Sequence, residues 1–467
     1  VEPPIGKESL YATQFKNLPI GQMEEKFADY GEVQIKQLND RSKMYYTPNK
    51  ENNVFQLVVQ YGAGEREFPK LGYAAQLMNN AGIMGAYEPQ ELKEELSKLN
   101  ATCHVTADDD NLYIIMEGYE ATLPQACQLL SRQILMPKLD EKQLARLKGS
   151  AMGMRQQRKD NVSILNEALR QYMLYGEKSD YIKELTDKEI YELQISELTG
   201  DINRASNYEA KVFFTGTLPF DQVYDILSKN LPLVANERPS NSPQAKDMMP
   251  VTENTVYFLP NNDAEQAQIH LYIPMQKADK KDDVLRSAFN QYFGLDFTGI
   301  VLNEIREKRS MAYTAYAFVG TQGIAGKASY LRGYIGTQND KANDALDVLM
   351  GLVNDMPKNP ERIDNIKSYL RQAMLTSHPS FRNKAMELVD LGYRGYTDDP
   401  AKENLPKVDA LTFDDIVKFY EENIKDKPYC ISIMGNPKNI DLKRLEKFGK
   451  VVKLNERKLF NTKDALF

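Results

Sequence analysis

An internal repeat constrains the fold of this chain more than any other feature of its sequence. Residues 45–49 (YYTPN) recur as residues 257–261 (YFLPN), so the two prolines are 212 positions apart. Three further pairs match in the same order at similar intervals: Gly82 with Gly294, Met136-Pro137 with Met356-Pro357, and Gly216 with Gly435. Four ordered matches whose intervals differ by only a few residues indicate two copies of one unit.

Each copy is predicted to contain both strands and helices. In the first copy, clusters of β-branched and aromatic residues predict strands near 43–48, 54–62, 101–107, 111–117 and 208–216. Apolar spacing predicts helices near 69–81, 88–99 and 219–230, with three more helical stretches within 120–175. Short turns between neighbouring strands favour a largely antiparallel sheet. The predicted fold is α+β, with two tandem copies of an α/β sandwich unit and helices on one face of each sheet.

Proline-rich segments suggest the domain boundaries. Residues 1–25 contain three prolines and little periodicity, and are predicted to form an N-terminal arm or linker. Residues 232–253 contain four prolines among Asn and Ser, and are predicted to link the copies. The first domain then spans 26–231 and the second 254–467.

Composition excludes several classes of function. The 467 residues carry a net charge of −7, which argues against binding to nucleic acid. No apolar run approaches the roughly 20 residues that span a bilayer, so no membrane span is expected. The start of the chain lacks an initiator Met and a signal peptide, which suggests a processed or excised piece. Three cysteines form no disulfide framework, and no two of the three histidines have metal-ligand spacing.

The sharpest local signal is a predicted junction between a helix and a strand. Leu302 and Ile305 form an apolar stripe on a helix expected to end near residue 309, and alternation from Tyr313 to 319 then predicts a strand. Arg306 and Tyr313 would flank this junction and could aim two hydrogen-bond donors at a peptide carbonyl and the oxyanion formed on it. The alternative is that Arg306 only solvates a helix face and Tyr313 packs in the core.

At this junction the sequence resembles a known family. Residues 304–313 (EIREKRSMAY) are similar to the EIREKRGLAY signature of the insulinase/pitrilysin-type zinc metallopeptidases, the inverzincins. The resemblance extends over nearly the whole chain from about residue 26, and is strongest to the C-terminal half of the long bacterial members. It implies that Tyr313 stabilises the tetrahedral intermediate and that Arg306 holds the substrate main chain, both acting on a zinc site in the opposite half.

The zinc motif of that family is absent from this chain. Its H-x-x-E-H sequence supplies two zinc ligands and a general base. Tyr73, Gln76 and Leu77 stand at the three corresponding positions, and residues 146–158, where a further acidic ligand is expected, contain no acid. We therefore expect this chain to bind no metal or other cofactor, and zinc to lie in a partner half.

Three functions remain open from the sequence. The first is the zinc-less half of a metalloendopeptidase, which closes a peptide chamber around an extended substrate. Its partner would be a zinc-bearing N-terminal half or a separate catalytic subunit. The second is an inactive scaffold or peptide-binding subunit of a larger complex. The third is a different metal site built from scattered residues. The resemblance also implies a bacterial periplasmic or cell-envelope location.

Overall fold

The computed structural model describes residues 10, 11, 14, 24–235, 237–295 and 298–463. The predicted arm of residues 1–25 therefore lies almost entirely outside the described residues. The first copy contains strands β1 (Gln34–Gln37), β2 (Lys43–Pro48), β3 (Val54–Tyr61), β4 (Gly82–Ile83), β5 (Ala101–Ala107), β6 (Leu112–Tyr119), β7 (Pro137–Lys138) and β8 (Ala210–Gly216). Its helices are α2 (Leu71–Met78), α3 (Pro89–Lys98), α4 (Leu123–Leu135), α5 (Glu141–Gln157), α6 (Val162–Tyr175), α7 (Asp180–Lys183), α8 (Asp187–Tyr191), α9 (Ile195–Ala205) and α10 (Phe220–Asn230).

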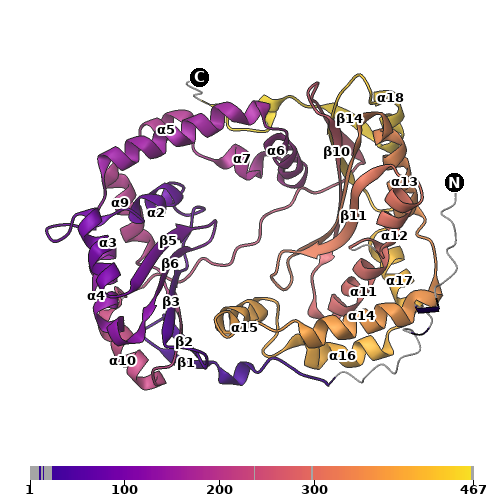
Figure 1. Ribbon diagram of the computed structural model, residues 1–467. Coiled ribbons are helices and arrows are strands. Elements are labelled where there is room, and N and C mark those ends of the chain that lie inside the picture. The colour runs from indigo at the N-terminus through magenta and orange to yellow at the C-terminus, as the bar shows by residue number, and fades with distance from the viewer. Residues whose placement is uncertain (1–9, 12–13, 15–23, 236, 296–297, 464–467) are drawn as a thin grey trace.

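The second copy repeats this arrangement of strands and helices (Figure 1). Its strands are β9 (Thr255–Pro260), β10 (Gln266–Lys277), β11 (Ala312–Thr321), β12 (Ala328–Gln338), β13 (Cys430–Gly435) and β14 (Lys450–Lys453). Its helices are α11 (Asp283–Phe293), α12 (Ile300–Leu302), α13 (Ala342–Asn354), α14 (Ile363–Thr376), α15 (Lys384–Tyr393), α16 (Pro400–Ala410), α17 (Phe413–Asn423) and α18 (Leu442–Leu445).

The two large sheets have the same strand order. The first runs β1-β2-β8-β3-β6-β5, and the second, in matching order, runs β14-β9-β13-β10-β12-β11. Pairing is antiparallel except for β2 with β8 and for β9 with β13 and β14. The predicted α+β class, its two copies and its largely antiparallel sheets are confirmed. The edge strand next to β2 or β9 differs, because β1 is the first strand of the first copy whereas β14 is the last strand of the second.

The residues that revealed the repeat occupy equivalent places in the two sheets. Pro48 pairs with Gly216 at the end of β2 and β8, and Pro260 pairs with Gly435 at the end of β9 and β13. In each copy the asparagine after the proline donates its N–H to the carbonyl of that glycine, over 2.7 and 2.9 Å. The sequence repeat therefore marks one strand pairing that is built twice.

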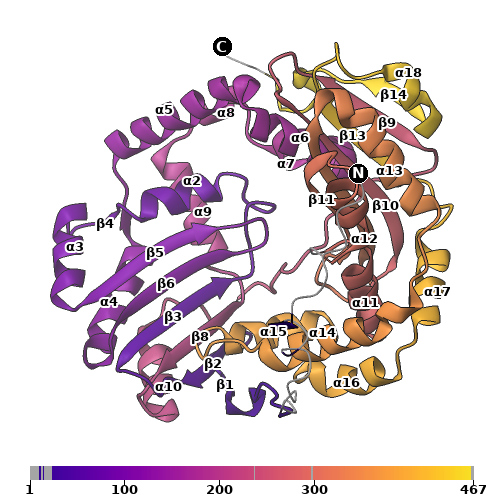
Figure 2. The same cartoon turned by 45° about the vertical axis from the view of Figure 1, so that its right-hand side comes forward.

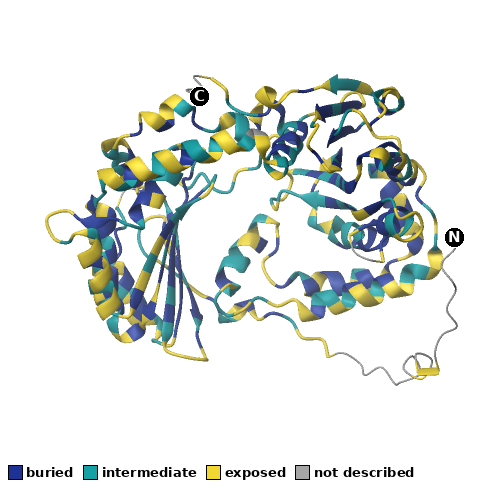
Figure 3. Ribbon diagram, turned by 45° about the horizontal axis from the view of Figure 1, so that its top comes forward, coloured by how far each residue is buried: buried dark blue, intermediate teal, exposed yellow. Residues whose placement is uncertain are grey.

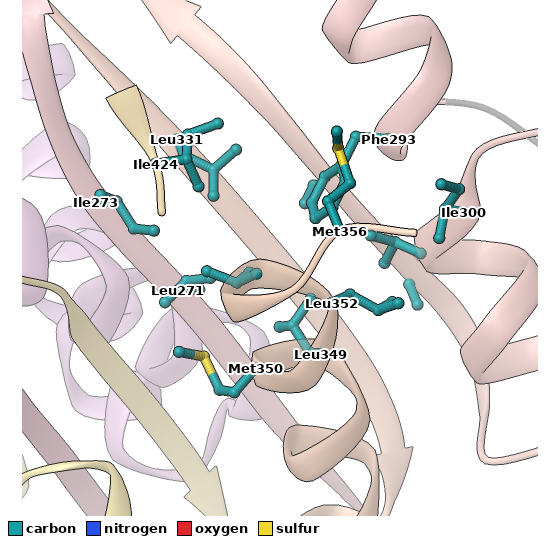
Figure 4. Packing of buried hydrophobic residues seen from close by; sticks show 14 of the residues in the cluster. Leu271, Ile273, Phe293, Ile300, Leu331, Leu349, Met350, Leu352, Met356 and Ile424 are labelled. Carbon is teal, nitrogen blue, oxygen red and sulfur yellow. The ribbon is translucent and has the colours of Figure 1, made fainter. Parts of the chain in front are cut away.

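Each sheet buries one face against helices of its own copy. Figure 4 shows this packing in the second copy, where Leu271 and Ile273 on β10 and Leu331 on β12 meet Leu349 and Met350 on α13. In the first copy the corresponding apolar face lies against α2, α4, α9 and α10. Figure 3 shows the exposed residues gathered on the outer sides of these helices. Apolar residues at every second strand position thus build two separate cores.

The opposite face of each sheet is covered in part by a helix from the other copy. Leu165 and Leu169 on α6 of the first copy pack against Leu259 on β9 and Met434 on β13. Reciprocally, Ala385 on α15 of the second copy packs against the first sheet, in a cluster with Val33, Val58 and Phe213. Figures 1 and 2 show α15 beside the first sheet and α6 beside the second. Because α6 and α15 hold the same place in the repeat, the copies exchange equivalent helices.

The segment 232–253 runs between the copies and is bonded to both. The Lys246 ammonium pairs with Asp109 of the first copy at 2.8 Å and with Asp180 at 2.7 Å. The Lys246 N–H donates to Oε1 of Gln322, in the turn between β11 and β12, over 2.7 Å. The Met249 N–H donates to the carbonyl of Leu174 on α6 over 2.7 Å. The segment is therefore bonded to one turn of each sheet and to α6.

A neutral histidine lies under the exchanged helix α6. His270 on β10 is 3% exposed, and its Nε2 lies 3.0 Å from Oδ1 of Asn166 on α6. Burial, together with the nearby Arg332 and Arg170, lowers the pKa of His270 to about 3. An unfolded histidine has a pKa near 6.5, so between these values the unfolded chain binds a proton that the folded chain does not.

His270 is therefore expected to make the fold less stable in mild acid. Between pH 7.5 and pH 5 it should lower the free energy of unfolding by about 2 kcal/mol. In urea denaturation, His270→Gln should not show this acid-dependent fall in the free energy of unfolding. His378→Gln, at an exposed histidine, should show the same fall as wild type. The same pH slope in wild type and His270→Gln would contradict the assignment.

Candidate functional site

The helix-to-strand junction is a compact chain reversal. Helix α12 continues into one π-helical turn, Asn303–Glu307, so helical backbone ends two residues before the expected position near 309. The Met311 N–H donates to the carbonyl of Ile305 over 2.9 Å, and Ser310 adopts a positive φ of 49°. Ile305 is fully buried in the core of the second copy. These bonds fix where β11 leaves the helix.

An ion-paired carboxylate braces this reversal. Glu304 accepts hydrogen bonds from Lys308 Nζ at 2.6 Å and from Arg309 Nη1, which also donates to the Glu304 carbonyl at 2.7 Å. Burial opposes ionisation, but these two cations lower the pKa of the Glu304 carboxyl. Sequence reasoning missed this role, although Glu followed four residues later by Lys is a recognisable helical pairing signal.

Tyr313 lies in a β-bulge at the start of β11. The strand predicted here is confirmed, and Ala315, Ala317 and Val319 face the core as their alternation predicts. Tyr313 does not share that face, because the register with β12 shifts between Ala312 and Thr314 and Tyr313 is the extra residue. A bulge re-aims one side chain without disturbing the rest of the strand. Tyr313 is consequently 77% exposed, so the core-packing alternative for this residue is wrong.

The structure brings Arg306 and Tyr313 together. The Arg306 guanidinium carbon lies 4.9 Å from the centroid of the Tyr313 ring, in a cation–π arrangement. Arg306 Nε also lies 3.4 Å from Oε1 of Glu307, and its side chain is 32% exposed. No hydrogen bond joins the Tyr313 hydroxyl to another described residue. The pair presents a guanidinium and a phenol at the protein surface, and both groups can donate to a carbonyl or an oxyanion.

The positions that correspond to the zinc motif lie on α2. Leu77 is buried in the apolar core of the first copy, Gln76 is exposed, and Tyr73 is half-buried. Burial raises the pKa of the Tyr73 phenol; the nearby Arg155 opposes this, and Glu184 adds to it. Tyrosine, glutamine and leucine at these places supply neither imidazole ligands nor a carboxylate base.

Acidic residues beside Tyr73 are paired with arginines. Arg155 on α5 donates to Oδ1 of Asp187 at 2.7 Å and lies 3.3 Å from Oε2 of Glu184. Arg158 donates through both terminal nitrogens to the Glu184 carboxylate. In the described part of the chain, no group of three or more His, Cys, Asp or Glu residues could hold a metal ion. The sequence did not reveal this cluster, because Glu184 and Arg158 are 26 residues apart.

A cavity of about 680 Å³ adjoins this cluster. It lies within the first copy, between α7 and the segment 232–253. Residues of both charges line it, including Glu65, Arg66, Glu184 and Lys246. Burial and the neighbouring aspartates raise the pKa of the Glu65 carboxyl. Acids and bases thus alternate around this cavity, unlike the lining of a metal site.

None of the described helices is long and apolar enough to cross a bilayer.

Residues 206–370 match the family model of the peptidase M16 inactive domain. Comparison with curated proteins gives no match.

Several solved structures share the fold. The chain is similar to a peptidase M16 inactive domain from Pseudomonas fluorescens, with a TM-score of 0.67, 17% identity, and coverage of 88% of this chain and 99% of that one. It is similar to the ferredoxin protease FusC in complex with Arabidopsis ferredoxin (TM-score 0.66, 13% identity, 91% and 49% coverage). It is also similar to the periplasmic protease PqqL from Escherichia coli (TM-score 0.65, 12% identity, 91% and 50% coverage). The chain thus spans about half the length of the two proteases and nearly all of the Pseudomonas protein.

Proposed function

We propose that this chain is the zinc-less half of a zinc metalloendopeptidase, because residues 206–370 match the family model of the peptidase M16 inactive domain. It closes a chamber around an extended peptide, while a zinc-bearing half supplies the metal and the general base. The proposed role does not require this chain to bind a metal ion. The substrates are peptides or unfolded proteins, since only an extended chain can enter such a chamber and add to a sheet edge.

The observation that carries the proposal is the exposure of Tyr313. A bulge turns this tyrosine outward instead of into the core, and the Arg306 guanidinium lies against its ring. In the assembled enzyme, the phenol donates a hydrogen bond to the oxyanion that forms when water attacks the scissile carbonyl. Arg306 donates to a substrate carbonyl and holds the main chain in place. The zinc ligands and the general base would come from the other half.

The coding sequence upstream of Val1 tests the partnership. An in-frame H-x-x-E-H motif with an acidic helix further along would identify a covalent N-terminal half. A separate start would direct the search to a neighbouring gene for a catalytic subunit. Peptide hydrolysis should then require both halves. If no zinc-bearing partner exists, the proposal fails, and an inactive peptide-binding scaffold becomes the better description.

Arg306 is expected to govern substrate binding more than chemistry. In the assembled enzyme, Arg306→Ala should raise KM about tenfold, because a charged donor to the substrate main chain is worth roughly 1.5–3 kcal/mol. Its kcat should change much less. Steady-state kinetics with a quenched fluorescent peptide measure both constants. The control is Arg457→Ala, at an exposed arginine in the turn Glu456–Lys458 outside the junction. A large fall in kcat with constant KM would contradict this role.

We also propose a periplasmic location in a bacterium, by analogy with PqqL. Fractionation of the native cells decides this, since recovery in the cytoplasm would exclude it.

A further inference from the structure

The cavity beside α7 contains one acidic side chain that lacks a counter-charge. Four other acids of the described chain line this cavity, and each is paired with a lysine or an arginine: Asp109 and Asp180 with Lys246, Glu184 with Arg158, and Asp247 with Lys178. Glu65, in the turn between β3 and α2, lines the same cavity. No hydrogen bond or ion pair from a described residue reaches its carboxylate. Glu65 is therefore the uncompensated acid of this lining.

The position of Glu65 is set by backbone contacts. Its N–H donates to the carbonyl of Asp108, in the turn between β5 and β6, over 2.8 Å. Its carboxylate lies against Gly72 in the first turn of α2, where a methyl group on residue 72 would come within 1.9 Å of Glu65 Oε1. The glycine thus makes room for the carboxylate at the wall of the cavity.

The surroundings of Glu65 favour a cation as its partner. The side chain is half-buried, and burial followed by the charges of Asp109, Asp108 and Asp180 raises the pKa of its carboxyl. Each of these influences opposes the ionised form, whereas an opposite charge within a few ångströms favours it. A cation that reaches Glu65 would therefore relieve this penalty, and an anion would increase it.

The walls of the cavity suit a planar cation in particular. Tyr175 and Tyr181 line it, and each ring already carries a positive group. Lys246 Nζ lies 5.7 Å from the ring centroid of Tyr175, and the Arg158 guanidinium carbon lies 5.7 Å from that of Tyr181. A guanidinium combines bidentate pairing to a carboxylate with stacking on aromatic rings. The volume of about 680 Å³ lies within the range of small-molecule sites.

We propose that this cavity binds a small organic cation with a guanidinium head group, and that Glu65 is its counter-ion. The guanidinium donates two parallel hydrogen bonds to the Glu65 carboxylate, and its alkyl chain lies along the tyrosines. Two sources carry this head group, a free alkylguanidine and an arginine side chain of a polypeptide. The site lies on the other copy from Tyr313 and does not depend on the proposed peptidase role.

Titration of the full chain with butylguanidine, followed by saturation-transfer difference NMR, tests the inference. Wild type should bind this probe saturably and should not bind butylurea, a neutral molecule of the same shape. Glu65→Gln should weaken binding at least about tenfold, as expected for loss of charged hydrogen bonds. Asp247→Asn removes the same charge from the same cavity, but at an exposed acid that is paired with Lys178. It should change the affinity by less than about twofold.

Gly72→Ala is a second variant that keeps the charge of Glu65. Its added methyl group must displace the carboxylate, so binding of butylguanidine should weaken severalfold. Urea denaturation should show no loss of stability, because alanine is favoured over glycine in a helix and the displaced group is the end of a flexible side chain. This variant tests the site even if Glu65→Gln does not fold.

Three results would overturn the inference. These are absence of saturable binding by wild type, equal binding of butylguanidine and butylurea, or equal affinity of wild type and a folded Glu65→Gln. Titration with N-acetylarginine amide distinguishes the two sources. Tighter binding than butylguanidine would identify an arginine side chain, and weaker binding would identify a free cation; both outcomes retain Glu65 as the counter-ion. None of these measurements needs zinc or hydrolysis, so failure of the site and failure of the proposed peptidase role are distinguishable.

Discussion

Replacing Tyr313 with phenylalanine in the assembled enzyme is expected to lower kcat by about 10²–10³-fold, or roughly 3–4 kcal/mol of transition-state stabilisation. The substitution removes one hydroxyl and leaves the ring, so the cation–π contact with Arg306 persists. The bulge that turns residue 313 outward is a backbone feature and should persist as well. KM should change little, because the oxyanion exists only after water has attacked the peptide.

A matched control tests whether removing the hydroxyl of any exposed tyrosine has the same effect. Tyr191 on α8 is 68% exposed, close to the 77% of Tyr313, and its replacement by phenylalanine should leave kcat unchanged. Both variants should unfold at the wild-type urea concentration. A fall of less than threefold for Tyr313→Phe would exclude an oxyanion role and favour the scaffold alternative.

The second large effect concerns the exchanged helix α6. Leu169 is fully buried and packs against Leu259 and Met434 of the other copy. Leu169→Ala should lower the free energy of unfolding by about 2–5 kcal/mol, through lost burial and the cavity left behind. Urea denaturation followed by circular dichroism measures this change.

The control for this substitution uses the same change of side chain at the surface. Leu135, at the end of α4, is 56% exposed, so Leu135→Ala should alter stability by less than about 0.5 kcal/mol. A Leu169→Ala effect as small as the control would mean that α6 contributes little to holding the copies together.

Local sequence signals predicted the longer strands of the first copy and α10 closely, but not β1 or α9. Strands β2 and β5 have the predicted bounds, and β3, β6, β8 and α10 differ by one or two residues at one end or, for β6, at both. These segments combine a clear period with turn residues at both ends, so local chemistry decides their bounds. The repeat itself was recognisable because Pro48 and Pro260 occupy one conserved place in the strand pairing.

Features that depend on distant contacts were not predicted. The strict alternation through Tyr313 gave no sign of a bulge, which is set by the register between β11 and β12. Equally, the apolar face of α6 showed that the helix packs somewhere, but not that its partner strands belong to the other copy. Arg306 and Tyr313 were predicted to flank the junction, and they do. The bulge brings their side chains into contact. Their part in catalysis stays a prediction.

The reciprocal packing of α6 and α15 has a consequence for how the repeat can be divided. When two identical units trade the same element, the arrangement is that of a domain-swapped dimer. Here the two units are covalently joined, and the segment 232–253 is the tether. A cut in this tether separates the repeats in sequence but not in space. Each excised copy would lack its partner's helix and expose the strip of sheet that this helix covers. The joined pair is therefore expected to be more stable than either copy alone.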